Sequence, residues 1–76
     1  MELHHINGTE VGFHSSAMEA VDFLKNGVHG STAQGYLDYA KEHGEAHFYD
    51  KNGVKFTIRH ESKDGQANYS VEKSDS

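Results

Sequence analysis

The sequence contains no cysteine and no proline, and it is poor in apolar residues. Without cysteine, neither disulfides nor thiolate zinc sites can stabilise the chain. Only 34% of the residues are apolar, but they recur at regular spacings, which is typical of a folded chain and not of a disordered one. The 76 residues suffice for a single domain, 1–76, near the lower size limit for independent folding, so packing must supply its stability.

Long hydrophobic stretches are missing as well. No run of residues approaches the roughly 18 apolar positions of a membrane-spanning helix. The first residues, Met1 to His5, lack the basic and apolar regions of a signal peptide. We therefore expect a protein that does not enter a membrane and that stays in the cytoplasm.

Positive charge is scarce, and the formal net charge is −5 with seven histidines taken as neutral. Residues 1–44 carry six acidic and two basic side chains, whereas residues 45–76 carry six and five. Because neutralisation of phosphates supplies most nonspecific affinity for nucleic acids, we expect DNA or RNA binding to be unfavourable. An acidic surface favours solubility, or docking on a basic protein surface.

A clear strand pattern occupies the last third of the chain. Between Glu45 and Glu72, three runs alternate apolar and polar residues, and Asn52-Gly53 and Lys63-Asp64-Gly65 separate them. Alternate side chains of a strand share one face, and Asn-Gly and Asp-Gly supply the positive φ angles of tight hairpins. We expect three antiparallel strands, with one apolar face formed by Ala46, Phe48, Val54, Phe56, Ile58, Ala67, Tyr69 and Val71.

A second hairpin is expected at the N-terminus, where residues 3–6 and 9–13 flank Asn7-Gly8. Gly12 would weaken its second strand, mark a bulge or allow a close approach of another group to the backbone. The pattern leaves open whether this hairpin joins the main sheet.

Two helices are expected between the hairpin and the sheet. Residues 16–19 and 31–34 each match the capping box, and Asn26-Gly27 and Gly44 are typical helix ends. Gly35 lies inside the second helix at a cost of about 1 kcal/mol relative to alanine, either as a surface residue or to admit another backbone. The apolar positions at helical spacing are Ala17, Ala20, Val21 and Leu24, then Ala33, Tyr36, Leu37 and Ala40.

The element order ββααβββ predicts a small two-layer α+β domain, in which two short helices pack on one face of an antiparallel sheet. The polar residues 73–76 are expected to fray.

The sequence offers little support for catalysis or metal binding. The histidines lack ligand spacing, since His43 and His47 straddle Gly44 and so cannot share a helical face. Neither a Gly-x-Ser-x-Gly elbow nor a phosphate-binding glycine loop is present. A helix-turn-helix would place Asp38 and Glu42 against phosphates, which is unfavourable. We therefore assign no catalytic, cofactor or metal-binding residue.

Two surfaces are candidates for binding a partner, and an ordinary solvated surface also explains each of them. If the helices cover one sheet face, the polar phase of the strands forms an exposed platform, and arginine and tyrosine are enriched at binding hot spots. The candidate residues on this platform are Tyr49, Lys55, Thr57 and Arg59. Four carboxylates on the helices form the second candidate surface: Glu19, Asp22, Asp38 and Glu42.

The sequence thus leads to the hypothesis of a non-enzymatic protein-binding or regulatory module, such as a modulator or inhibitor of a larger protein. Small acidic regulators carried by phages and mobile elements have a similar composition, although no motif supports the analogy. One alternative is a nucleic-acid-binding module that uses the sheet face around Lys55, Thr57 and Arg59; another is a small metal protein or enzyme that uses the histidines. A homodimer stays open, because one small core has little room for Phe23, Tyr36 and Tyr39 together.

Overall fold

The computed structural model describes residues 1–63 and 65–74, with all of their side chains except those of residues 63, 66 and 67. An N-terminal hairpin comes first, and a broken helical segment and a longer helix follow it. Three further strands complete the chain. The elements are β1 (Glu2–Ile6), β2 (Thr9–Phe13), η1 (Ser15–Ala17), α1 (Met18–Asp22), η2 (Phe23–Gly27), α2 (Gly30–His43), β3 (Glu45–Tyr49), β4 (Lys55–Lys63) and β5 (Gln66–Lys73).

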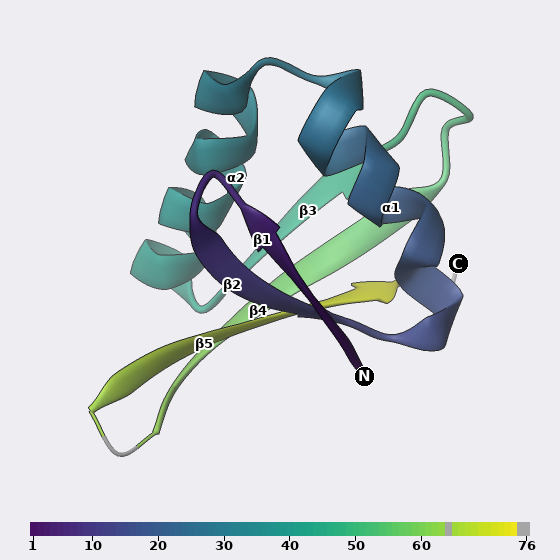
Figure 1. Ribbon diagram of the computed structural model, residues 1–76. Coiled ribbons are helices and arrows are strands. Elements are labelled where there is room, and N and C mark those ends of the chain that lie inside the picture. Colours follow the sequence, from purple (N-terminus) through teal and green to yellow (C-terminus); the bar gives the residue numbers. More distant parts are fainter. Residues whose placement is uncertain (64, 75–76) are drawn as a thin grey trace.

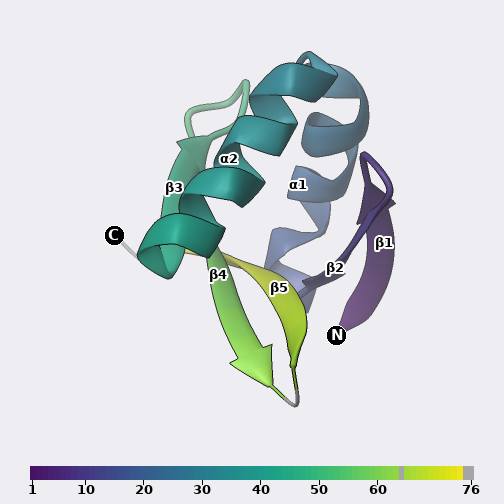
Figure 2. The same ribbon diagram turned by 90° about the vertical axis from the view of Figure 1, so that its left-hand side faces the viewer.

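The five strands form one sheet in the order β1-β2-β5-β4-β3, so the N-terminal hairpin does join the main sheet. The helical segments lie on one face of this sheet (Figures 1 and 2), which confirms the two-layer α+β domain. The sheet is antiparallel, as expected, except where the hairpin joins it, because β2 runs parallel to β5. A parallel pair needs a long crossover, and here the helices, β3 and β4 lie within that connection.

Each hairpin has its own turn chemistry. At Asn7-Gly8 both residues have positive φ, 53° and 81°, as a tight two-residue turn requires. At Asn52-Gly53 only the glycine has positive φ, because the Asp50 carboxylate accepts hydrogen bonds from the backbone N–H groups of Asn52 and Val54. The second turn is therefore a longer loop closed by Asp50, and not the expected two-residue turn. In the third turn, Asp64 lies outside the described residues.

The helices begin earlier than the capping boxes predicted. The first helical segment starts at Ser15 and α2 at Gly30, so Ser16 and Ser31 already lie inside helical turns and cap neither helix. The N-cap side chains make no hydrogen bond in either case. The end of α2 is as expected: Gly44 has a φ of 92°, and its N–H donates to the Ala40 carbonyl at 2.7 Å.

The core lies between the sheet and the helices, and it confirms the expected phase of the strands. Ring centroids of Phe23, Tyr36 and Phe56 lie 5.8, 5.2 and 5.5 Å from that of Phe48, which makes this ring the centre of an aromatic cluster. The fully buried apolar residues are Ile6, Val11, Phe13, Ala17, Ala20, Leu24, Ala33, Leu37, Ala40, Ala46, Phe48, Phe56, Ile58 and Val71. Val54 and Tyr69 are partly buried, and the side chain of Ala67 lies outside the described ones.

Truncation of a central ring should destabilise this domain severely. Phe56 is fully buried against Phe48, so Phe56→Ala should lower the free energy of unfolding by about 3–5 kcal/mol. This is a large part of the stability that a small domain has. Chemical denaturation measures the effect, with Tyr39→Ala as a surface control that should change stability by no more than about 0.5 kcal/mol. Equal stability of Phe56→Ala and the wild type would contradict the packing described here.

Gly35 inside α2 and Gly44 directly after it should respond in opposite directions to the same substitution. A methyl group at Gly35 would meet no atom within 4 Å, so Gly35→Ala should stabilise the protein by up to about 1 kcal/mol through helix propensity. Gly44→Ala should destabilise it by about 1–2 kcal/mol, because alanine tolerates positive φ poorly. Thermal unfolding of the two variants checks both signs, and a loss of stability in Gly35→Ala would be inconsistent with an open helix surface.

Candidate functional site

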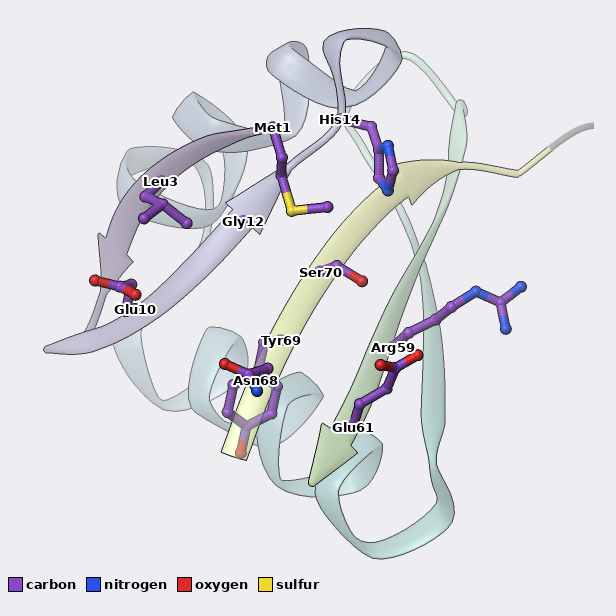
Figure 3. Close-up of a pocket in the computed structure, with 10 residues that line it drawn as sticks. All are labelled: Met1, Leu3, Glu10, Gly12, His14, Arg59, Glu61, Asn68, Tyr69 and Ser70. Carbon is purple, nitrogen blue, oxygen red and sulfur yellow. The ribbon is translucent and has the colours of Figure 1, made fainter. Parts of the chain in front are cut away.

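One face of the sheet is not covered by the described helical segments. Strand register decides which side chains point to this open sheet face, because alternate residues of each strand share a face. Figure 3 shows part of it, with the helices behind the sheet. The open sheet face consists of Leu3, His5, Glu10, Gly12, Glu45, His47, Tyr49, Lys55, Thr57, Arg59, Glu61, Asn68, Ser70 and Glu72.

The four platform residues expected from the sequence all belong to the open sheet face, but they are not equally accessible. Tyr49, Lys55 and Arg59 are exposed, whereas Thr57 is only 4% exposed. The Thr57 hydroxyl lies 2.9 Å from Nδ1 of His47 and also bonds the hydroxyl of Ser74. Thr57 is therefore a buried structural contact and not part of an exposed platform.

Ion pairs of Arg59 link three strands across this face. Its Nε donates a hydrogen bond to a Glu72 carboxylate oxygen at 2.7 Å, and Nη1 lies 3.9 Å from Oε1 of Glu45. The hydrogen bond from Arg59 holds the pKa of Glu72 below its ordinary value, and the same bond raises the pKa of Arg59. Both side chains remain exposed enough to water that screening limits the strength of the pair. The network fixes the direction of the guanidinium group.

A chain of polar contacts on β3 and β4 invites comparison with catalytic triads. Oε2 of Glu45 lies 3.0 Å from Nε2 of His47, and Nδ1 of the same ring faces Thr57. This order of carboxylate, imidazole and hydroxyl is the one that activates a nucleophile in hydrolases. Thr57 is buried, however, and it lines neither of the two hollows that are described below. The geometry orients the imidazole but gives a substrate no approach to the hydroxyl.

A hollow of about 510 Å³ lies on the open sheet face over the parallel strand pair. Gly12 of β2 and Ser70 of β5 are direct neighbours in register. Glycine has no side chain and that of serine is small, so no large side chain projects from the sheet at this point. Figure 3 shows Met1 and Leu3 on one side of the hollow and Arg59 with Glu61 on the other. The residues that line it are Met1, Leu3, Glu10, Gly12, His14, Arg59, Glu61, Asn68, Tyr69 and Ser70.

Three of the four large exposed apolar side chains in the described part of the chain lie on this face, Met1 and Leu3 at the β1 edge and Tyr49 at the β3 edge. Met1, Leu3 and Tyr49 are 71%, 59% and 60% exposed; Tyr39 on α2, at 55%, is the fourth large exposed apolar side chain among the described residues. Of these four exposed apolar side chains, the sequence analysis named only Tyr49 as a candidate for binding. A signal for Leu3 was present, since it is an apolar residue in the polar phase of its strand.

The four carboxylates of the second candidate surface do not form one cluster. Glu19 and Asp22 line a hollow of about 530 Å³ together with Asp50, whereas Asp38 and Glu42 do not. Asp38 accepts a hydrogen bond from the Gln34 side chain at 2.9 Å. Burial, with a smaller contribution from the Asp38 charge, raises the pKa of Tyr69. The acidic side chains therefore occupy two separate places on the helical side.

Two histidines, His4 and His60, pack against aromatic rings. The rings of His4 and His60 lie 5.7 and 5.1 Å from those of Phe13 and Tyr69, and their Nε2 atoms are buried without a hydrogen-bond partner in the described part of the chain. Nε2 of His4 lies 3.4 Å from a Glu2 oxygen, which is too long for a good hydrogen bond. Within residues 1–63 and 65–74, no three His, Asp or Glu side chains come close enough together to hold a metal ion.

Comparisons of this chain with protein-family models, curated proteins and solved structures found no significant match. No helix in the described part of the chain has the length and apolar character needed to cross a membrane. The case for a function therefore depends on the open sheet face itself.

The ion pair between Arg59 and Glu72 predicts a pH-dependent contribution to stability. Because folding lowers the pKa of Glu72, the contribution is complete above its ordinary value of 4.5 and is lost as the pH falls through the pKa of the folded state. Glu72→Gln should lower the melting temperature by a few degrees at most near neutral pH, and the difference from the wild type should shrink in acid.

Thermal unfolding of both proteins between about pH 7 and pH 2.5 measures this difference. The control is the Arg59→Gln background, in which a second substitution at Glu72 should have no further pH-dependent effect. A difference between wild type and Glu72→Gln that stays constant down to the lowest pH would contradict the role of the pair.

Proposed function

We propose that this protein is a non-enzymatic module that binds another protein through its open sheet face and so regulates it. The observation that carries the proposal is that three large exposed apolar side chains lie on a face without a helical cover, with Met1 and Leu3 at its β1 edge and Tyr49 at its β3 edge. Met1 and Leu3 lie together at Gly12, and an exposed apolar group on a small domain is typical of interaction sites. Tyrosine is enriched at binding hot spots.

The Arg59 network gives this face a second property of interfaces. Ordering of a long side chain on binding costs about 0.5–1.5 kcal/mol. The bond to Glu72 and the contact with Glu45 already restrain the guanidinium group in the free protein, which reduces that cost. A planar, oriented arginine beside exposed apolar groups is suited to recognition of a protein surface.

The same face is less suited to nucleic acid, the main alternative. Of its three expected contact residues, Thr57 is buried and Arg59 is engaged by carboxylates, so only Lys55 is left to meet phosphate. Four glutamates share the face with these two cations among the described side chains, and their charge opposes a phosphate backbone. This balance favours a protein as the partner.

A regulatory role fits the size and shape of the molecule. The hollows described here are open at the surface and lack the enclosure in which small substrates are bound and converted. The effect of the protein would then be exerted through its partner, as in a modulator or inhibitor of a larger protein. The cytoplasm is the location that we include in this proposal, since the chain has no cysteine for disulfides.

A photo-crosslinking amino acid in place of Tyr49 should capture the partner in cells that produce the protein. Tyr39 provides a matched control, because it is a tyrosine of similar exposure on the helical side. We expect a discrete protein adduct from position 49 and none from position 39. An adduct from position 39 alone, or crosslinking from position 49 to nucleic acid alone, would refute the proposal.

A further inference from the structure

The hollow on the open sheet face has an unusual floor for a sheet surface. Gly12 carries no side chain and Ser70 beside it carries a small one, so no large side chain rises from these two neighbouring strand positions. Gly12 itself is buried, because the Met1 side chain lies over it, and Ser70 is partly exposed. Met1 and Leu3 lean over Gly12: a Cβ atom built there would collide with the Met1 sulfur and lie 3.5 Å from Cδ2 of Leu3. One wall of the hollow is therefore apolar and, through the flexible methionine, adaptable.

The remaining walls of the hollow carry negative charge. Glu10 and Glu61 contribute carboxylates from β2 and β4 (Figure 3), and neither makes an ion pair with a described residue. Arg59 lines the hollow too, but its charge is balanced by Glu72 and Glu45. A ligand that enters the hollow thus meets aliphatic groups on one side and net negative charge around them.

From this geometry we infer that the hollow receives a polypeptide segment of the partner in which an aliphatic side chain stands next to an arginine or lysine. The aliphatic group would pack on Met1 and Leu3 beside Ser70, and the cation would face Glu10 or Glu61. The inference rests on the proposed function, which it deepens by naming the chemistry of the partner.

Charge complementarity favours this polypeptide segment over a second copy of the chain and over nucleic acid. A second copy of the chain would bring another net charge of −5 toward the same acidic rim, which opposes association. Nucleic acid would bring phosphates toward the same carboxylates. A basic segment with an apolar anchor complements both features of the hollow.

The test uses dipeptides that isolate each feature of the occupant. Acetyl-Leu-Arg-amide is titrated into the 15N-labelled protein and compared with acetyl-Leu-citrulline-amide, which has the same shape without charge, and with acetyl-Gly-Arg-amide, which lacks the apolar group. We expect saturable shifts of the Gly12 and Ser70 amide signals, with affinity about two- to fivefold weaker for either comparison peptide. Absence of saturable shifts at these residues, or equal affinity for the citrulline peptide, would overturn the inference.

Two sets of variants locate the binding. Glu10→Gln combined with Glu61→Gln should abolish the preference for arginine over citrulline and leave the fold intact, since both side chains are exposed. Ser70→Leu should fill the floor and abolish the shifts, whereas His5→Leu, on the same face but outside the hollow, should not. If Ser70→Leu does not fold, the double glutamine variant decides, and a retained arginine preference in it would refute the inference.

Crosslinking at position 49 separates the two proposals. If position 49 captures a protein but the peptide titrations show no binding in the hollow, the open sheet face binds a partner and the hollow is not its docking point. If the peptides bind in the hollow with the expected preference but position 49 captures no protein, the site chemistry stands and the proposed function fails.

Discussion

Parallel pairing of β2 with β5 holds the two ends of the described chain in one sheet. The pair consists of Val11, Gly12 and Phe13 opposite Tyr69, Ser70 and Val71, and the His14 N–H extends it by a bond to the Val71 carbonyl at 3.0 Å. Without this pairing, the N-terminal hairpin would be a two-stranded unit, which is marginally stable in water by itself. This one connection therefore adds the N-terminal hairpin to the sheet formed by the other three strands.

The same pairing builds both sides of the sheet. Toward the helices, Val11, Phe13 and Val71 are fully buried and form the middle of the core. Toward the open side, the intervening residues are Gly12 and Ser70, which leave a hollow where larger side chains would have made an even surface. Core and candidate site are thus consequences of the alternation along two strands, and a shift of register by one residue would exchange them.

The sequence predicts the local features of this structure well and the long-range ones poorly. Strand phase, the Asn7-Gly8 turn and the Gly44 helix end depend on neighbours in the chain, so patterns of a few residues suffice to find them. The β2–β5 pair joins residues from opposite ends of the chain, and alternation alone does not identify the partner of a strand. The capping boxes were wrong because the helices begin one turn or less before the serines, a boundary that tertiary packing decides.

The site shows the same division. The strand phase placed Tyr49, Lys55 and Arg59 correctly on the face opposite the helices. It also predicted that Thr57 is exposed because threonine is polar, but Thr57 is buried and its hydroxyl bonds to His47 and Ser74. The acidic residues of the two helices were grouped because they are close in sequence, although the packing of the helices separates them in space.

Nuclear Overhauser effects between β2 and β5 test the central claim most directly, which is that one parallel strand pair joins the N-terminal hairpin to the sheet and so completes both the core and the open sheet face. Protons of Gly12 and Ser70 should give cross-strand signals in solution, together with signals between Val11 and Tyr69 and between Phe13 and Val71. The amide of His14 should also be protected from hydrogen exchange by its bond to Val71. An N-terminal hairpin that shows only the signals between β1 and β2, and none to β5, would contradict the account.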